Sequence, residues 1–237
     1  MCVLAIAWEA HPRWRLVVAA NRDEFHDRPA EPLHRWADAD LIAGRDVRAG
    51  GTWLGISAGR FAAVTNLRGF GGPDPGRASR GALVENLATG GGDYGSVATA
   101  LEGDFNPYNA IVVDATGAHF LSNRPQADAF ALAPGFHAMS NGPLDPPWRK
   151  TVRLRDVIEA WLGTSGDPAM LLDGLRDPNP PAGDGDDPTA IFVDNPVYGT
   201  RCSTIVAIDR DGSGTIIERR FASDTAVTGE TALAFAW

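Results

Sequence analysis

Residues 2–24 read CVLAIAWEAHPRWRLVVAANRDE, and this stretch decides the fold. It contains two apolar runs of strand-forming side chains, at 2–8 and 15–20, separated by a polar turn at 11–13. Two such runs around a short turn predict a β-hairpin. Because the strands of a hairpin run back alongside each other, we expect the polar end of the second strand, at 21–24, to lie beside the start of the first.

The other apolar runs also follow one another as hairpins. Further strands are predicted over 43–46, 52–57, 61–67, 109–114, 119–122, 136–140, 202–209 and 215–221. Helical spacing of apolar residues predicts helices over 79–87, 148–162 and 167–175, the first of them capped by Ser79. Antiparallel hairpins with helices packed outside indicate the α+β class rather than a Rossmann-type parallel sheet. Without a repeat or a clear boundary, we predict a single domain over 1–237, with a surface loop at 177–188.

Composition narrows the classes of function. A net charge of −9 argues against non-specific binding to nucleic acid or to an anionic membrane, although one or two Arg in a cleft suffice to bind a small anion. Two cysteines are too few for a disulfide-stapled secreted domain, and neither a signal peptide nor an apolar run of roughly 18 residues is found. We therefore expect a cytoplasmic protein without stable membrane insertion. Nearly all basic residues are Arg, with Lys150 the single Lys, which suggests a GC-rich bacterial genome.

Cys2 follows Met1, and its small side chain favours removal of that methionine. Removal leaves a free α-amine, which titrates at about pH 7.7–8 and can serve as an intramolecular base. A thiol beside its own amine is the cysteine form of an N-terminal nucleophile, in which the nucleophile and its base belong to one residue. The alternative is a buried Cys at the start of a core strand, which is common in globular proteins.

The block at 21–24 places charged groups beside Cys2 if the hairpin turns at 11–13. The guanidinium of Arg22 would favour the thiolate, and the carboxylate of Asp23 could hold and orient the α-ammonium. A charged strand end that points into water is the alternative interpretation of the same residues.

Side-chain amides and a further Arg lie at the ends of other predicted strands. Asn66 and Asn141 could each donate to a developing oxyanion, and Arg201 could bind a carboxylate or stabilise the thiolate. Asn141 followed by Gly142 is equally explained as a tight turn. The five His residues show no metal-ligand spacing, and no phosphate-binding glycine motif is present. We interpret Cys202 as a buried strand residue.

Six blocks, in order along the chain, resemble the NRDE family, which is the family of transport and Golgi organisation protein 2. They are Met1-Cys2, NRDE at 21–24, GGTWLG at 50–55, Thr65-Asn66, Ser140-Asn141-Gly142 and Gly199-Thr200-Arg201. The resemblance implies a four-layer αββα sandwich of antiparallel sheets, like that of N-terminal nucleophile hydrolases. In the related choloylglycine hydrolase and penicillin V acylase group, Arg, Asp and Asn side chains assist an N-terminal Cys. The positions that look similar here are Cys2, Arg22, Asp23, Asn141 and Arg201.

The chain departs from those hydrolases at one point. They separate the Arg from the Asp by two residues, whereas Arg22 and Asp23 are adjacent. Adjacent residues on a regular strand point to opposite faces of the sheet, so both can serve Cys2 only where the strand is bulged or ends.

The first function that this pattern predicts is hydrolysis of a non-peptide amide, or of a related thioester, through an acyl-Cys2 intermediate. It requires no cofactor, and Asn21, Glu24, Trp53 and Asn66 are assigned to substrate binding. The proposed ligand is a small amphipathic or anionic molecule.

The alternative is a binding and trafficking protein without catalysis, which carries haem, an acyl-CoA or a lipid, because the resembling family is linked to haem trafficking and lipid metabolism. A haem would be held reversibly, since the sequence lacks the CxxCH attachment motif. A structural or interaction module is a third option, to which an acidic sequence without repeats gives little support.

Overall fold

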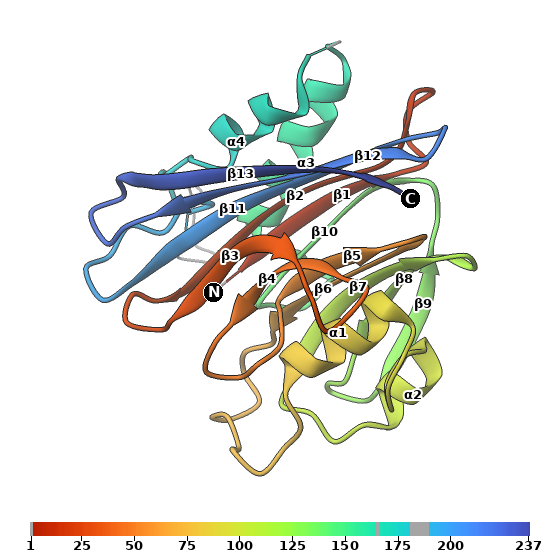
Figure 1. Ribbon diagram of the computed structural model, residues 1–237. Coiled ribbons are helices and arrows are strands. Elements are labelled where there is room, and N and C mark those ends of the chain that lie inside the picture. The colour runs from red at the N-terminus through yellow and green to blue at the C-terminus, as the bar shows by residue number, and fades with distance from the viewer. Residues whose placement is uncertain (1, 165, 181–189) are drawn as a thin grey trace. The chain divides into compact units, whose positions relative to one another are not determined.

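The computed structural model describes residues 2–164, 166–180 and 190–237. Contacts divide the chain into two compact units. Unit 1 comprises the chain up to Asp27 together with Pro134–Ala236, and unit 2 comprises Arg28–Ala133 together with Trp237. Each unit is built on its own antiparallel sheet (Figure 1). That the whole chain forms a single domain stays a prediction.

In its described residues, unit 1 has a six-stranded sheet in the order β10-β1-β2-β11-β12-β13, with all neighbouring pairs antiparallel. The strands are β1 (Val3–Trp8), β2 (Trp14–Phe25), β10 (Gly135–Ser140), β11 (Tyr198–Asp209), β12 (Ser213–Phe221) and β13 (Val227–Ala236). The predicted opening hairpin is confirmed, with Val3 opposite Asn21. β2 continues to Phe25 because β11 pairs with it over the same length. The charged block at 21–24 therefore lies inside a strand rather than beyond its end.

Helices cover one face of the unit 1 sheet (Figure 1). They are α3 (Arg149–Leu162), the short 3₁₀ helix η1 (Pro168–Met170) and α4 (Leu171–Gly174). The helix predicted over 148–162 is confirmed, and the one predicted over 167–175 consists of η1 and α4. The surface loop predicted at 177–188 lies mostly outside the described residues.

The core beneath α3 follows from two periodicities. Val3 and Ala5 are two residues apart on β1 and point to the same face, while Leu154 and Ile158 are four residues apart on α3. All four are buried in one cluster. Burying a side chain such as Leu or Ile contributes about 1.5–3 kcal/mol. This cluster therefore fixes the middle of α3 over the start of β1.

In its described residues, unit 2 has a seven-stranded sheet whose strands follow one another in chain order from β3 to β9. They are β3 (Ala30–Arg35), β4 (Ile42–Asp46), β5 (Leu54–Ser57), β6 (Arg60–Asn66), β7 (Tyr108–Asp114), β8 (Gly117–Ser122) and β9 (Asp128–Leu132). The helices are α1 (Arg80–Thr89) and α2 (Val97–Glu102). Leu83 and Leu87 of α1 share a core with Ala62 of β6 and Ala110 of β7. The predicted helix and hairpins of this unit are confirmed.

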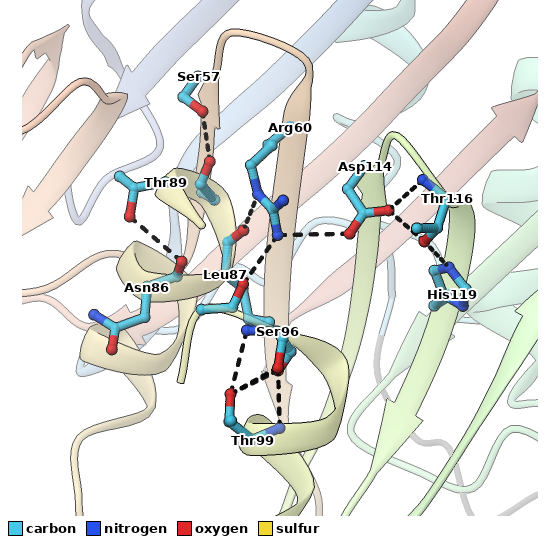
Figure 2. A network of polar contacts seen from close by, with 12 residues as sticks. Ser57, Arg60, Asn86, Leu87, Thr89, Ser96, Thr99, Asp114, Thr116 and His119 are labelled. Carbon is cyan, nitrogen blue, oxygen red and sulfur yellow. Dashed lines mark hydrogen bonds and ion pairs between the residues drawn. The ribbon is translucent and has the colours of Figure 1, made fainter. Parts of the chain in front are cut away.

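Side chains from the sheet close the C-terminal end of α1 (Figure 2). Ser57 Oγ donates to the carbonyl of Ala88 at 2.5 Å, and Arg60 Nε donates to the carbonyl of Leu87 at 2.9 Å. The last carbonyls of a helix have no donor within the helix, so these two bonds satisfy them. Arg60 also pairs with Asp114 at 3.5 Å. The network thus ties α1 to β5, β6 and β7.

The other end of α1 packs against the glycine turn before β5. Ser79 accepts hydrogen bonds from the backbone of Gly81 and Ala82, which confirms it as the N-cap. A Cβ added at Gly51 would lie 2.3 Å from the carbonyl carbon of Gly81, so no larger residue fits without a backbone shift. Gly51 of the GGTWLG block is therefore explained by packing within unit 2.

The sequence does not predict β3, β9, β13 or α2. The three strands are all edge strands of their sheets. An edge strand has one neighbouring strand and much contact with water, so it need not carry a continuous apolar pattern. α2 has six residues, which is too short for a helical periodicity to be recognised.

Candidate active site around Cys2

The end of β10 holds Cys2 at the start of β1. The backbone N of Cys2 donates to Asn141 Oδ1 at 2.7 Å, and Ser140 Oγ donates to the carbonyl of Cys2 at 2.7 Å. β10 pairs with β1 so that Ser140 lies opposite Val3, which brings Ser140 and Asn141 to this position. Cys2 itself is half-buried. The predicted proximity of Asn141 to Cys2 is thus present, through the backbone nitrogen.

The thiol of Cys2 lies beside the backbone of β2. Its Sγ is 4.0 Å from the carbonyl oxygen of Asp23, and the same oxygen accepts a hydrogen bond of 2.7 Å from the hydroxyl of Tyr198. Tyr198 and the thiol therefore approach the same carbonyl oxygen. Sequence reasoning missed Tyr198, although it immediately precedes the Gly199-Thr200-Arg201 block.

The carboxyl group of Asp23 is buried next to Thr200. Its Oδ1 accepts a hydrogen bond of 2.7 Å from Thr200 Oγ1, and Asp23 is 3% exposed. Burial raises the pKa of Asp23 from 3.8 to about 6, while the charge of the N-terminal amine, the charges of Lys150 and Arg22 and the bond from Thr200 act in the opposite direction. At neutral pH the carboxyl is therefore mostly ionised, and it places a negative charge inside the protein near Cys2.

A β-bulge lies opposite the adjacent charged residues of β2. Asp23 pairs with Thr200, but Arg22 pairs with Cys202, so the pairing of β11 with β2 passes over Arg201. A bulge disturbs the regular alternation of side chains. The extra residue, Arg201, belongs to the partner strand β11, whereas Arg22 and Asp23 are consecutive residues of β2 that pair with Cys202 and Thr200.

Arg22 is buried and pairs with Cys202 of the neighbouring strand β11. Burial raises the pKa of the Cys202 thiol well above its usual value, and Glu218 adds to this effect, whereas Arg22 opposes it. Cys2 also raises the pKa of the Cys202 thiol. Arg22 thus lies opposite Cys202, and its role towards Cys2 stays a prediction. The prediction that Cys202 is a buried strand residue is confirmed, since it is 4% exposed.

Arg201 closes the end of β2. Its Nη1 donates to the carbonyls of Phe25 and His26, at 2.9 and 2.8 Å. Glu24 Oε1 accepts a bond of 2.9 Å from the backbone N of Phe25. Both charged side chains thus have contacts that shape this strand end, and their roles towards a substrate stay predictions.

Asn21 connects β2 to the segments that cover it. Its Nδ2 donates to the carbonyls of Leu175 and Ile191, at 2.8 and 2.9 Å, and its Oδ1 accepts a bond of 2.6 Å from Ser203. A buried amide with three bonds holds these segments in place. Substrate binding by Asn21 stays a prediction.

Trp53 and Asn66 belong to unit 2. Trp53 directly precedes β5, and its carbonyl accepts a bond of 2.9 Å from Val64. Asn66 ends β6 opposite Tyr108 and is exposed. Their assignment to substrate binding stays a prediction.

Lys150 and Trp148 lie at the start of α3, and sequence reasoning did not assign them to the site. Lys150 is 0% exposed, and its Nζ is 5.3 Å from the centre of the Trp148 ring. The same ring packs on Gly142, where an added Cβ would lie 2.3 Å from it. Gly142 follows Asn141, so this contact supports the residue that holds Cys2. The signal in the sequence was the occurrence of the chain's single Lys at a helix start.

Neither a metal centre nor a membrane span is found in the described part of the chain. Its His, Cys, Asp and Glu side chains form no group of three or more that could hold a metal ion. Among its helices, none has the length and hydrophobicity needed to cross a membrane.

The sheets and helices have the fold of the N-terminal nucleophile hydrolases. The structure is similar to that of the Caenorhabditis elegans N-acylethanolamine-hydrolyzing acid amidase (NAAA) ortholog, with a TM-score of 0.53. The similarity covers 86% of this chain and 92% of that chain, at 11% sequence identity, and is therefore one of fold alone. The predicted α+β class of antiparallel sheets is confirmed.

The chain belongs to the family described as Transport and Golgi organisation 2, whose sequence pattern matches residues 1–223. It is 33% identical to the Transport and Golgi organization protein 2 homolog of Homo sapiens, over 92% of each chain. It is 25% identical to the Transport and Golgi organization protein 2 of Drosophila melanogaster, over 92% of this chain and 91% of the relative. The resemblance seen in six short blocks thus extends along nearly the whole chain.

Proposed function

We propose that the protein is an N-terminal cysteine hydrolase, which cleaves a non-peptide amide or a related thioester through an acyl-Cys2 intermediate. The observation that carries the proposal is the environment of Cys2. Asn141 accepts a hydrogen bond from its backbone nitrogen, and its thiol lies beside Asp23 and Tyr198. Loss of Met1 would convert that nitrogen into the α-amine, already oriented by Asn141.

In the first half of the reaction, the α-amine takes the thiol proton and the sulfur attacks the substrate's carbonyl carbon. The resulting oxyanion accepts hydrogen bonds, for which the Asn141 amide is the nearest candidate donor to Cys2. The carbon–nitrogen or carbon–sulfur bond of the substrate then breaks, and the α-ammonium gives its proton to the leaving amine or thiolate. Cys2 is left as a thioester with the acyl group.

In the second half, water attacks the thioester. The α-amine takes a proton from the water, the new carbon–oxygen bond forms, and the carbon–sulfur bond to Cys2 breaks. The proton returns to the thiolate, and a carboxylic acid leaves. Asp23 contributes a buried negative charge that favours the α-ammonium between the two proton transfers, and Arg22 stabilises the thiolate.

The fold neighbour supports the choice of an amide. By its name, the Caenorhabditis elegans protein hydrolyses N-acylethanolamines, in which an acyl group is joined to a small amine by a non-peptide amide. An acyl amide or acyl thioester of the same general kind fits the small amphipathic ligand expected for this chain. Arg201 remains a proposed contact for an anionic substrate group.

The test compares two single substitutions of cysteine. We expect wild type and the control Cys202→Ala to hydrolyse a dodecanoyl amide of aminomethylcoumarin or dodecanoyl-CoA. Cys2→Ala should lose this turnover while its thermal unfolding matches that of wild type. Equal turnover by Cys2→Ala and wild type would overturn the proposal, as would retention of Met1 on the active protein.

A further inference from the structure

The single Lys of the chain is buried completely. Lys150 is 0% exposed and is one of the largest fully buried side chains. Lys is almost never fully buried unless it is paired, because removing an ammonium group from water costs several kcal/mol. Something in the surroundings of Lys150 must therefore compensate its charge.

The position of Lys150 is fixed from two sides. α3 packs on β1 through Leu154 and Ile158, which lie one and two turns after Lys150. Trp148, two residues before it, packs its ring on Gly142 and lies 5.3 Å from Lys150 Nζ. Because Gly142 adjoins the residue that holds Cys2, the ammonium group is placed by the same contacts that build the Cys2 site.

The negative group that Lys150 acts on is the carboxyl of Asp23, which is equally buried. The groups around that carboxyl come from several elements: Thr200 of β11 donates to it, and three positive charges act on it, most strongly the N-terminal amine, then Lys150 of α3 and Arg22 of β2. Tyr198 of β11 binds the backbone carbonyl of the same residue. Arg22 also lowers the pKa of the Cys202 thiol, which Glu218 raises. Lys150 is thus the cation on the helix side of Asp23.

We infer that Lys150 is a positioning residue of the Cys2 site, whose ammonium group is a buried counter-ion of the Asp23 carboxylate in addition to the N-terminal amine. It acts through Asp23, whose ionised form it favours at neutral pH against the effect of burial. Without Lys150, Asp23 would take up a proton at a pH where the wild-type carboxyl is charged. The consequence for catalysis rests on the proposed function, whereas the proposed interaction of Lys150 with Asp23 does not.

The first test needs no substrate. Because the chain has one Lys, protein grown with lysine labelled with ¹³C at Cε gives one side-chain signal. This signal should shift with pH in a step near the Asp23 pKa of about 6. The step should vanish in Asp23→Asn and persist in the matched control Asp156→Asn, an exposed carboxyl on α3. A wild-type signal without a step, or the same step in Asp23→Asn, would overturn the inference.

The second test measures the pH profile of kcat/KM on dodecanoyl aminomethylcoumarin amide, for Lys150→Met, Lys150→Arg and the exposed control Arg155→Met. In the proposed mechanism the acidic limb falls first with protonation of the α-amine, at about pH 7.7–8, and falls more steeply below the Asp23 pKa of about 6. We expect Lys150→Met to move this second, steeper fall upward by about one pH unit, which is about a tenfold further loss at lower pH. Lys150→Arg should restore the limb, and Arg155→Met should leave it in place. A uniform loss at every pH in Lys150→Met would show a merely structural role and contradict the inference.

The two tests separate this inference from the proposed function. If Cys2→Ala retains full turnover, the cysteine mechanism fails, but the lysine signal still reports whether Lys150 and Asp23 interact. If the lysine signal is indifferent to Asp23 while Cys2→Ala is inactive, the inference fails and the mechanism stands.

Discussion

The ionised carboxyl of Asp23 carries a free-energy cost that a neutral amide in its place would not have. Its pKa is about 6 in the folded protein, against an ordinary value of 3.8, because burial disfavours the charge. This difference of about 2, at about 1.4 kcal/mol for each pKa unit, corresponds to about 3 kcal/mol. Asp23→Asn keeps the shape and the oxygen that accepts from Thr200, and it should remove this cost.

The sign follows from proton linkage. Below pH 3.8 the carboxyl is protonated in the folded and the unfolded state, so its ionisation costs nothing. Between 3.8 and about 6 the unfolded chain loses the proton first, and folding stability falls with rising pH. Above about 6 the full cost is present. The stability of Asp23→Asn relative to wild type should therefore rise by about 3 kcal/mol between about pH 4 and pH 7.

Urea unfolding followed by tryptophan fluorescence, at several pH values across this range, measures that difference. Asp156→Asn, at an exposed carboxyl on α3, is the matched control and should show no such trend. The reasoning is refuted if the stability difference between Asp23→Asn and wild type is independent of pH. It is also refuted if that difference falls as the pH rises, because the folded-state pKa of Asp23 would then lie below 3.8.

Three further predictions concern other parts of the molecule. Gly142→Ala should lower kcat/KM for the coumarin amide by a larger factor than it lowers the equilibrium constant of folding, because its Cβ would displace the Trp148 ring beside Asn141. Equal activity of the variant and wild type would contradict the role of this ring contact in supporting Asn141. Ser79→Ala should lower the free energy of unfolding by about 1 kcal/mol through loss of the α1 N-cap, as measured by urea unfolding, and an unchanged midpoint would contradict the capping role. Titration with hemin should give no saturable change in the Soret band if the protein is a hydrolase, whereas stoichiometric binding would favour the haem-carrying alternative.

The central strands of the fold are predictable from the sequence because burial imposes a pattern on them. β1 is apolar along its whole length and lies between β10 and β2, and β2 is apolar over residues 16–20. β13 is the opposite case. It lies at a sheet edge, its residues are exposed or half-buried in alternation, and it includes polar residues such as Thr228 and Glu230. Because β13 contacts water, it lacks the continuous apolar pattern from which a strand could have been predicted.

The sequence predicts only those residues of the site that the opening hairpin brings next to Cys2. The turn at 11–13 places the residues around Asn21 opposite Val3, so Arg22 and Asp23 come near Cys2 from local sequence alone. Tyr198, Thr200 and Lys150 come from distant segments. Their approach depends on the long β2–β11 pairing, the bulge at Arg201 and the packing of α3. These are tertiary relationships that no short stretch of sequence encodes.

The most direct test of the central claim is the mass of the protein after reaction. Protein made in cells is mixed with dodecanoyl-CoA, quenched in acid, and analysed by intact mass and peptide mapping. If Cys2 is the nucleophile, Met1 is absent and a dodecanoyl group is found on Cys2, and this group is lost on further incubation at neutral pH. A protein that retains Met1 and acquires no acyl group at Cys2 would contradict it.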